Sequence, residues 1–142
     1  MRNTVLSPRH RLRIAAHLDV AGAGSNREAL VALAAGANSE PGALAFVEMV
    51  RMYASTHERI APISGFVDFV GLPAAQSSKG LVMCLPADLV HWDKETERIV
   101  TALGAMAGNQ SATIAVLGDI TVRATKAMQR AGMKLQPQFM RW

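Results

Sequence analysis

Basic side chains recur at helical spacing in two segments of the chain, one near each end. Residues three or four positions apart lie on the same side of a helix, so each segment is predicted to present a cationic face. Such faces can neutralise the phosphates of DNA or RNA, whereas the alternative is that both are solvated surfaces opposite apolar stripes. The candidate anion-binding or nucleic-acid-binding residues are Arg9, Arg13 and His17 in the first segment, and Arg123, Lys126, Arg130 and Lys134 in the second.

A second candidate site lies in the sequence IAVLGDITVRA, residues 114–124. Gly118 and Asp119 are predicted to stand where a parallel strand meets the start of a helix. At such places α/β proteins bind anions through free N–H groups and the helix dipole. The segment contains neither a G-x-G-x-x-G pattern nor a P-loop lysine. Gly118 and Asp119 are therefore candidate ligand-binding residues, and the alternative is that Asp119 caps a helix.

Cys84 is the one cysteine of the chain, so an intrachain disulfide and a cysteine-rich zinc site are excluded. It lies in the apolar run LVMCL, where a thiol is normally buried and inert. Nucleophilic chemistry would require His91 together with Asp88 or Asp93, and nothing in the sequence brings His91 back to the thiol. The four histidines lack metal-binding spacing, so we expect no metal site. We assign no catalytic residue and no cofactor.

The first half of the chain has the pattern of three helices. The third and longest is predicted to carry an apolar stripe of Leu44, Val47 and Val50, with Phe46 and Tyr53 beside it. The first helix starts at Ser7-Pro8, the second follows a capping box at 25–28, and the third starts around 39–41 and ends between 56 and 62.

The second half changes to the period of strands, with two helices between them. Short apolar runs bounded by turn residues predict strands over 63–72, 81–85, 112–117 and 134–142, and a small polar loop over 73–80. Pro137 indicates an edge position for the last strand. One helix opens at 92–93, with Ile99, Val100, Leu103 and Met106 facing inward, and the other starts at Asp119 or Thr121 and closes at Gly132.

These elements predict an α+β or small α/β fold. An N-terminal helical segment would pack on a four-strand sheet with the order β-β-α-β-α-β, and residues 1–142 would form a single domain. The helical part would cover about 1–60 and the sheet-containing part about 61–142. The uncharged stretch 99–118 has a polar centre at 108–111, so we expect no membrane span.

The composition of the chain indicates which kind of partner and which cellular compartment to expect. A formal net charge of +4 with a pI of about 9.8 permits an anionic partner. One cysteine fits a reducing compartment, which predicts a cytoplasmic location. The composition, rich in Ala and Arg and poor in Lys, is typical of a GC-rich bacterial or phage genome.

Three functions remain open from the sequence. The leading hypothesis is a small non-enzymatic interaction or accessory protein whose basic surface binds nucleic acid or another anionic partner. A second is a small α/β enzyme or a nucleotide- or phosphate-binding domain centred on Gly118 and Asp119. The third is a structural subunit that self-associates through an exposed edge formed by Phe66, Phe69, Phe139 and Trp142.

Overall fold

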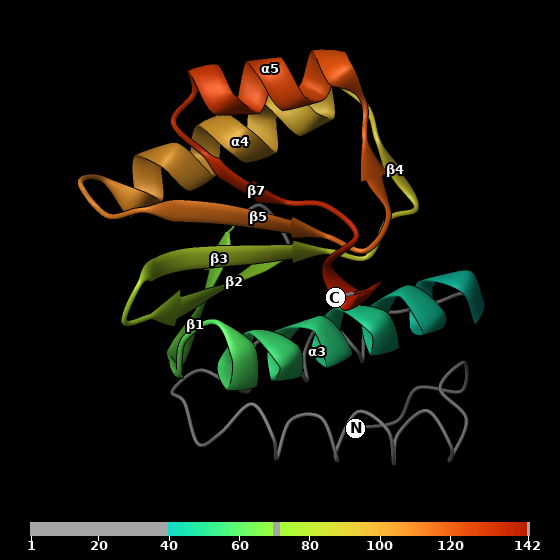
Figure 1. Cartoon of the computed structure of the whole chain (residues 1–142), viewed down its shortest axis with the longest axis vertical. Helices are drawn as coiled ribbons and strands as arrows, with labels where there is room; N and C mark the ends of the chain where they lie inside the picture. Colours follow the sequence, from blue (N-terminus) through green and yellow to red (C-terminus); the bar gives the residue numbers. More distant parts are fainter. Residues whose placement is uncertain (1–39, 70–71, 142) are drawn as a thin grey trace.

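Three layers form around a mixed sheet in the computed structural model, which describes residues 40–69 and 72–141 (Figure 1). Helix α3 covers one face of the sheet, and helices α4 and α5 cover the other (Figure 1). This arrangement confirms the α+β class. The elements are α3 (Glu40–Arg59), β1 (Ile63–Phe69), β2 (Leu72–Ser77), β3 (Gly80–Leu85), β4 (Leu89–Val90), α4 (Lys94–Ala107), β5 (Ala112–Val116), β6 (Asp119–Ile120), α5 (Val122–Arg130), β7 (Lys134–Gln136) and a 3-10 turn η1 (Phe139–Arg141).

The strand count and order differ from the prediction. The main sheet has five strands in the order β1-β2-β3-β5-β7, and β4 pairs with β6 in a separate two-stranded sheet. The predicted strand over 63–72 and loop over 73–80 form an antiparallel hairpin, in which Phe66 is opposite Ala75. The sequence of β2 lacks β-branched residues and resembles a loop, but its backbone pairs with β1 on one side and β3 on the other.

Strands β3 and β5 pair in parallel and are apolar except for Thr113, because helices cover both of their faces. Met83 is opposite Ile114, and both pack in the core beneath α4 and α5. Cys84 is opposite Ala115, and both pack in the core beneath α3. The alternation of side chains therefore divides one sheet between two cores.

Helix α3 confirms the predicted third helix in position and length. Its buried side includes Val47, Val50 and Tyr53, and the Tyr53 ring meets Phe66 edge-on at a centroid distance of 5.3 Å. The helix ends before Pro62, where the N–H groups of residues 60 and 61 both donate to the Thr56 carbonyl. Leu44, predicted to lie on the apolar stripe, is 46% exposed.

Helices α4 and α5 carry the two crossovers of the parallel strands, β3 to β5 and β5 to β7. Right-handed crossovers that advance across a sheet in one direction leave both helices on the same face, as observed. Helix α4 starts after Asp93, whose carboxylate accepts from the Thr96 N–H at 2.8 Å. Met106, predicted to face inward, is 36% exposed.

The chain leaves the sheet earlier than predicted at its C-terminal end. Strand β7 occupies the predicted edge position, but it ends at Gln136 instead of continuing to residue 142. Pro137 has no N–H to donate, and Gln138 then adopts a left-handed backbone with φ of 50°. The predicted helices before residue 39 lie outside the described residues, and within those residues no helix has the length and apolar composition needed to cross a membrane.

Candidate functional site

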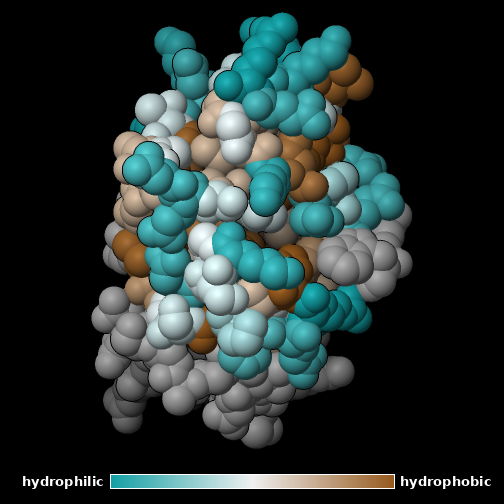
Figure 2. Space-filling view, turned by 60° about the vertical axis from the view of Figure 1, so that its left-hand side comes forward, coloured by the Kyte–Doolittle hydropathy of each residue, from teal (hydrophilic) through white to brown (hydrophobic). Residues whose placement is uncertain are grey.

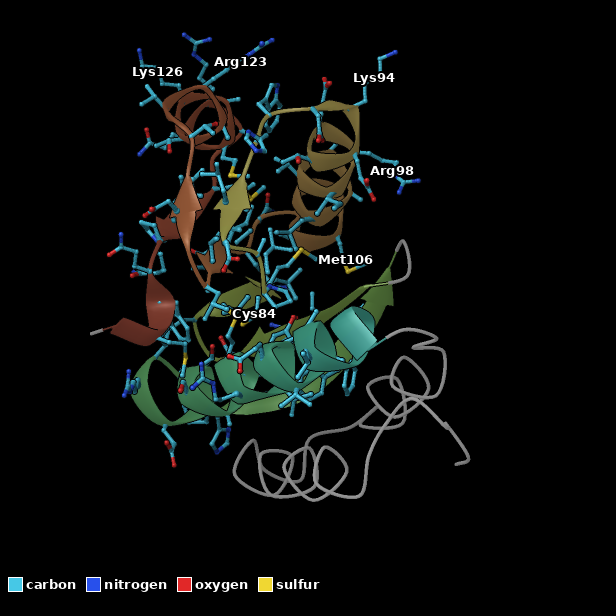
Figure 3. The ribbon with its side chains drawn as sticks, turned by 90° about the vertical axis from the view of Figure 1, so that its right-hand side faces the viewer. Cys84, Lys94, Arg98, Met106, Arg123 and Lys126 are labelled. Atoms are coloured by element: carbon cyan, nitrogen blue, oxygen red, sulfur yellow. The ribbon has the colours of Figure 1, made fainter. Side chains whose placement is uncertain are left out.

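The C-terminal cationic face predicted from the sequence is present on α5 and β7. Arg123, Lys126 and Arg130 are exposed on the side of α5 opposite its buried Ala124 and Met128. Figure 3 shows the labelled Arg123 and Lys126 side chains directed outward, away from the sheet. The exposed Lys134 begins β7, close after the end of the helix. We name this set the α5 ridge: Arg123, Lys126, Arg130 and Lys134.

The α5 ridge has no compensating acidic charge along its own stretch of chain. All eleven Asp and Glu residues of the protein precede residue 120, whereas five of its fifteen Lys and Arg residues follow that point. The ion pairs of the described residues, Arg51 with Glu48 and Arg98 with Glu95, leave the ridge unpaired. In Figure 2, hydrophilic side chains gather at the upper end of the molecule, where α5 lies, beside a smaller hydrophobic patch.

The residues of the predicted N-terminal cationic face, Arg9, Arg13 and His17, lie outside the described residues. The helical part of the α5 ridge extends seven residues from Arg123 to Arg130, which is about 10 Å of helix.

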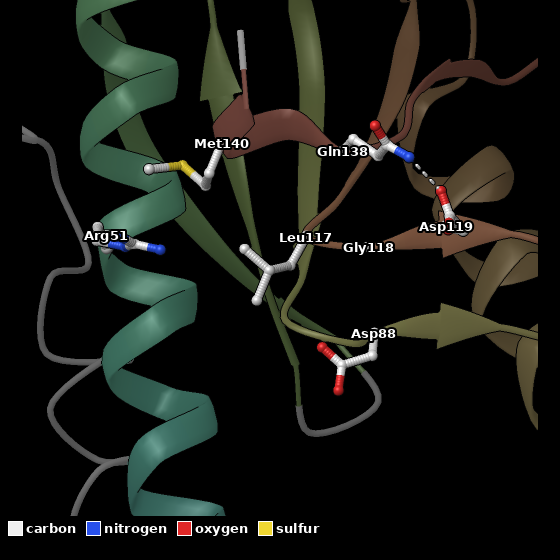
Figure 4. A pocket seen from close by; sticks show the side chains of 7 residues that line it. All are labelled: Arg51, Asp88, Leu117, Gly118, Asp119, Gln138 and Met140. Atoms are coloured by element: carbon white, nitrogen blue, oxygen red, sulfur yellow. Dashed lines mark hydrogen bonds between the residues drawn. The ribbon is translucent and has the colours of Figure 1, made fainter.

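A separate cavity of about 460 Å³ lies at the carboxyl ends of the three parallel strands, and we name it the strand-end cavity. Asp88 follows β3, Asp119 follows β5, and Gln138 follows β7, so the topology brings together residues far apart in sequence. Arg51 reaches the cavity from α3 (Figure 4). The lining residues are Arg51, Asp88, Leu117, Gly118, Asp119, Gln138 and Met140.

Gly118 and Asp119 are thus at a cavity, but the local geometry differs from the prediction. Asp119 does not cap α5, because it begins β6 and the cap is Thr121, whose hydroxyl accepts from the Ala124 N–H at 3.2 Å. The N–H groups of Gly118 and Asp119 donate to the carbonyls of Ala87 and Asp88 at 2.9 and 2.8 Å. These two N–H groups are therefore not free to bind an anion.

Gly118 allows two loops to touch. A Cβ atom at this position would overlap the carbonyl oxygen of Asp88 on the neighbouring loop. The Gly118 carbonyl accepts from the Gln138 N–H at 2.8 Å, and the Asp119 carboxylate accepts from the Gln138 side-chain amide at 2.6 Å (Figure 4). The cavity wall formed by these loops is held by hydrogen bonds on both sides of Gly118.

Two of the lining residues have no signal in the sequence. Arg51 is 68 residues from Asp119 and Gln138 is 19, and α3 and β7 bring them to the cavity by topology alone. Asp88 is a candidate partner of Cys84 by sequence, whereas in the structure it lies beside Gly118. The position of Asp88 shortly after a buried strand is the one available indication of this placement.

Cys84 lies in the core, where its hydrogen-bonding contacts among the described residues are with Thr56 and Tyr53. Its side chain is 2% exposed, its Sγ atom lies 3.7 Å from the Thr56 hydroxyl, and its N–H donates to the Tyr53 hydroxyl at 3.2 Å. Burial raises the pKa of the Cys84 thiol to about 12, with a smaller opposite effect from the hydrogen bond to Thr56. His91 is exposed. The thiol is therefore protonated near neutral pH.

Within the described residues, no group of three or more His, Cys, Asp or Glu side chains is placed to hold a metal ion. Comparison with known proteins adds no further assignment, because no family model, no curated protein and no solved structure matches the chain.

Proposed function

We propose that this protein is a small non-enzymatic accessory protein that binds double-stranded nucleic acid through the α5 ridge. The observation that carries the proposal is the exposed, unpaired set of four cations within a C-terminal stretch that contains no acidic residue. A cationic ridge of this kind neutralises phosphates and releases their counterions, which favours association irrespective of base sequence. A bacterial or phage origin and a cytoplasmic location, both expected from composition, agree with such a partner.

The ridge fits a duplex backbone better than a single strand. Binding of single strands relies on exposed aromatic side chains on which bases stack. Phe139, the aromatic residue nearest the ridge in sequence among those described, is fully buried. About 10 Å of duplex carries about six phosphate charges, which exceeds the three cations on the helical part of the ridge.

The two other functions have less support. Self-association was expected to use an exposed edge of four aromatic residues. Two of them, Phe66 and Phe139, are only 1% and 0% exposed, so they cannot contribute to such an edge. The side chains of Phe69 and Trp142 lie outside the described set. Phosphate binding at Gly118 and Asp119 would need their backbone N–H groups as donors. Both N–H groups already donate to carbonyls of the loop after β3.

Charge reversal along the ridge tests the proposal. The variant Arg123→Glu, Lys126→Glu, Arg130→Glu should lose binding to a labelled DNA duplex of random sequence while its circular dichroism spectrum and melting temperature stay close to wild type. All three side chains are exposed, so their replacement leaves both cores intact. Removing about two to three ion pairs with phosphates should lower the affinity at low salt by about a hundredfold or more.

The matched control changes the net charge equally at three exposed cations on other elements. Lys79→Glu, Lys94→Glu, Arg98→Glu alters the β2–β3 turn and α4 (Lys94 and Arg98 are labelled in Figure 3). We expect this control to keep most of the duplex affinity. Equal losses in both variants would mean that net charge and not the α5 ridge governs binding, and would overturn the assignment of the ridge.

A further inference from the structure

We propose that α5 lies in the major groove of B-form DNA and prefers A·T base pairs, with Val122 and Gln129 as the residues that contact the bases. This readout rests on the proposed function, because the cations of the α5 ridge supply the contacts to phosphates. Val122 and Gln129 are exposed on the same helix as those cations. They carry no charge, so the attraction to phosphates does not account for them.

The exposed side of α5 consists of two rows, each made by residues seven positions apart. Seven residues are nearly two turns, so side chains at this spacing lie within about 20° of each other around the helix. Val122 and Gln129 form an uncharged row, and Arg123 and Arg130 form a cationic row. The rows are about 100° apart, with Lys126 between them. One side of the helix can therefore face bases while the other faces a phosphate strand.

Val122 has the chemistry to contact a thymine methyl group. Its side chain is 72% exposed, the largest exposed fraction among the exposed large hydrophobic residues in the described part of the chain. In the major groove, thymine presents its C5 methyl group, which distinguishes it from cytosine. Contact between the valine and this methyl group would remove apolar surface of both partners from water. Val122 therefore favours thymine.

Gln129 has the chemistry to pair with adenine. Its side chain is exposed, and none of the described residues forms a hydrogen bond with its amide. A glutamine amide can donate to adenine N7 and accept from the adenine N6 amino group at the same time. Guanine presents an acceptor where adenine has this amino group, so the same two-point contact does not form. Gln129 therefore favours adenine.

The position of α5 suits insertion into a groove. The helix lies at the outer end of the molecule, and the labelled Arg123 and Lys126 side chains point outward from it (Figures 1 and 3). The major groove of B-form DNA is about 12 Å wide and admits a helix. The seven residues from Val122 to Gln129 extend about 10 Å, which corresponds to about three base pairs. Both contacts can therefore form in one stretch of groove.

Duplex RNA fits this surface less well than DNA does. An A-form duplex has a deep and narrow major groove that side chains cannot read. The cations of the α5 ridge would still meet phosphates there, but Val122 and Gln129 would have no base edges to contact. We therefore expect duplex RNA to bind only through its charge.

Fluorescence anisotropy with matched DNA duplexes of about 20 base pairs tests the readout on the full chain. The reference is an alternating A·T duplex. One analogue replaces thymine by deoxyuridine and lacks the methyl groups, and the other replaces adenine by 7-deazaadenine and lacks the N7 acceptors. All three carry the same phosphate charge, so differences in affinity report base contacts. We expect the reference to bind about threefold more tightly than the first analogue and about fivefold more tightly than the second.

Two variants assign the contacts to their residues. Val122→Ala should abolish the preference for thymine over deoxyuridine and keep the preference for adenine over 7-deazaadenine, whereas Gln129→Ala should do the reverse. Both variants retain the cations of the α5 ridge, so binding at low salt persists. Leu44→Ala on α3 and Gln110→Ala after α4 remove exposed side chains of similar kind, and these controls should keep both preferences.

The outcomes distinguish base readout from phosphate binding. Equal affinity of the wild type for the reference and both analogues would overturn the readout and leave phosphate binding by the α5 ridge in place. Equally tight binding of an alternating A·U RNA duplex would have the same meaning, because it would place the helix outside the groove. If no duplex bound at about 20 mM salt, the proposed function would fail and the readout with it.

Discussion

At the scale of single residues, Gly118 has the tightest steric requirement of the candidate sites. The loop after β5 touches the loop after β3 at this residue, and the backbone of Asp88 occupies the space where a Cβ would stand. Replacing Gly118 by Ala should therefore push the two loops apart and lower the free energy of unfolding by about 3 kcal/mol. Urea denaturation of wild type and variant measures this directly.

Gly104 provides the matched control for that substitution. It lies inside α4, and the nearest atom to an added Cβ would be the flexible Met133 Cε at 3.4 Å. Alanine is the better helix former by up to about 1 kcal/mol, so Gly104→Ala should be neutral or stabilising. If both variants had the same stability as wild type, the close contact at Gly118 would be wrong.

The buried thiol of Cys84 predicts a loss of stability in alkali. Burial raises its pKa from 9.0 to about 12, and burial also raises the pKa of the neighbouring Tyr53 hydroxyl. The folded state therefore holds these protons more tightly than the unfolded chain. The stabilising contribution of the thiol is fully present below about pH 9 and is lost as pH rises through about pH 12.

Unfolding curves recorded between neutral pH and about pH 11 should show this decline, and the decline should be shallower in Cys84→Ala. The same burial predicts that iodoacetamide modifies Cys84 in denaturant but not in the folded protein at neutral pH, as measured by mass spectrometry. Rapid modification of the folded protein would contradict the placement of Cys84 in the core.

At the scale of elements, α5 depends on its cap. The Thr121 hydroxyl accepts from the Ala124 N–H, and this contact fixes the start of the helix that carries the α5 ridge. Thr121→Ala should lower the free energy of unfolding by about 1 kcal/mol, whereas Thr121→Ser, which keeps the hydroxyl, should cost much less. Equal losses in the two variants would show that packing of the threonine methyl, and not the cap, is responsible.

Elements with strong periodicity were predictable, and those defined by partners were not. The apolar run of β3, the amphipathic α4 and the Gly132 that follows α5 with φ of 83° were found from local pattern alone. Strand β2 was missed because its Pro-Ala-Ala-Gln-Ser sequence has little strand preference, and pairing with two neighbours decides its conformation. The two-residue strands β4 and β6 are too short to give any period.

At the scale of the whole molecule, the two candidate sites differ in how far they could be predicted from the sequence. The α5 ridge follows from helical spacing along one segment, so the sequence shows it directly. Of the residues that line the strand-end cavity, the sequence indicated only Gly118 and Asp119 as candidate ligand-binding residues, and its other walls come from α3 and the segment after β7. The order of strands across the sheet decides which loops meet, whereas the sequence pattern predicted only the order of the elements along the chain.

The salt dependence of duplex binding tests the central claim most directly. Affinity for a DNA duplex of about 20 base pairs is measured from about 20 to about 200 mM salt, for the wild type and for Arg123→Glu, Lys126→Glu, Arg130→Glu. Four ridge cations predict that log K falls against log salt with a slope of about −3 to −4, and that the variant loses most of this slope. A flat dependence, no binding at the lowest salt, or the same slope in the variant would contradict the assignment of the α5 ridge as a nucleic-acid interface.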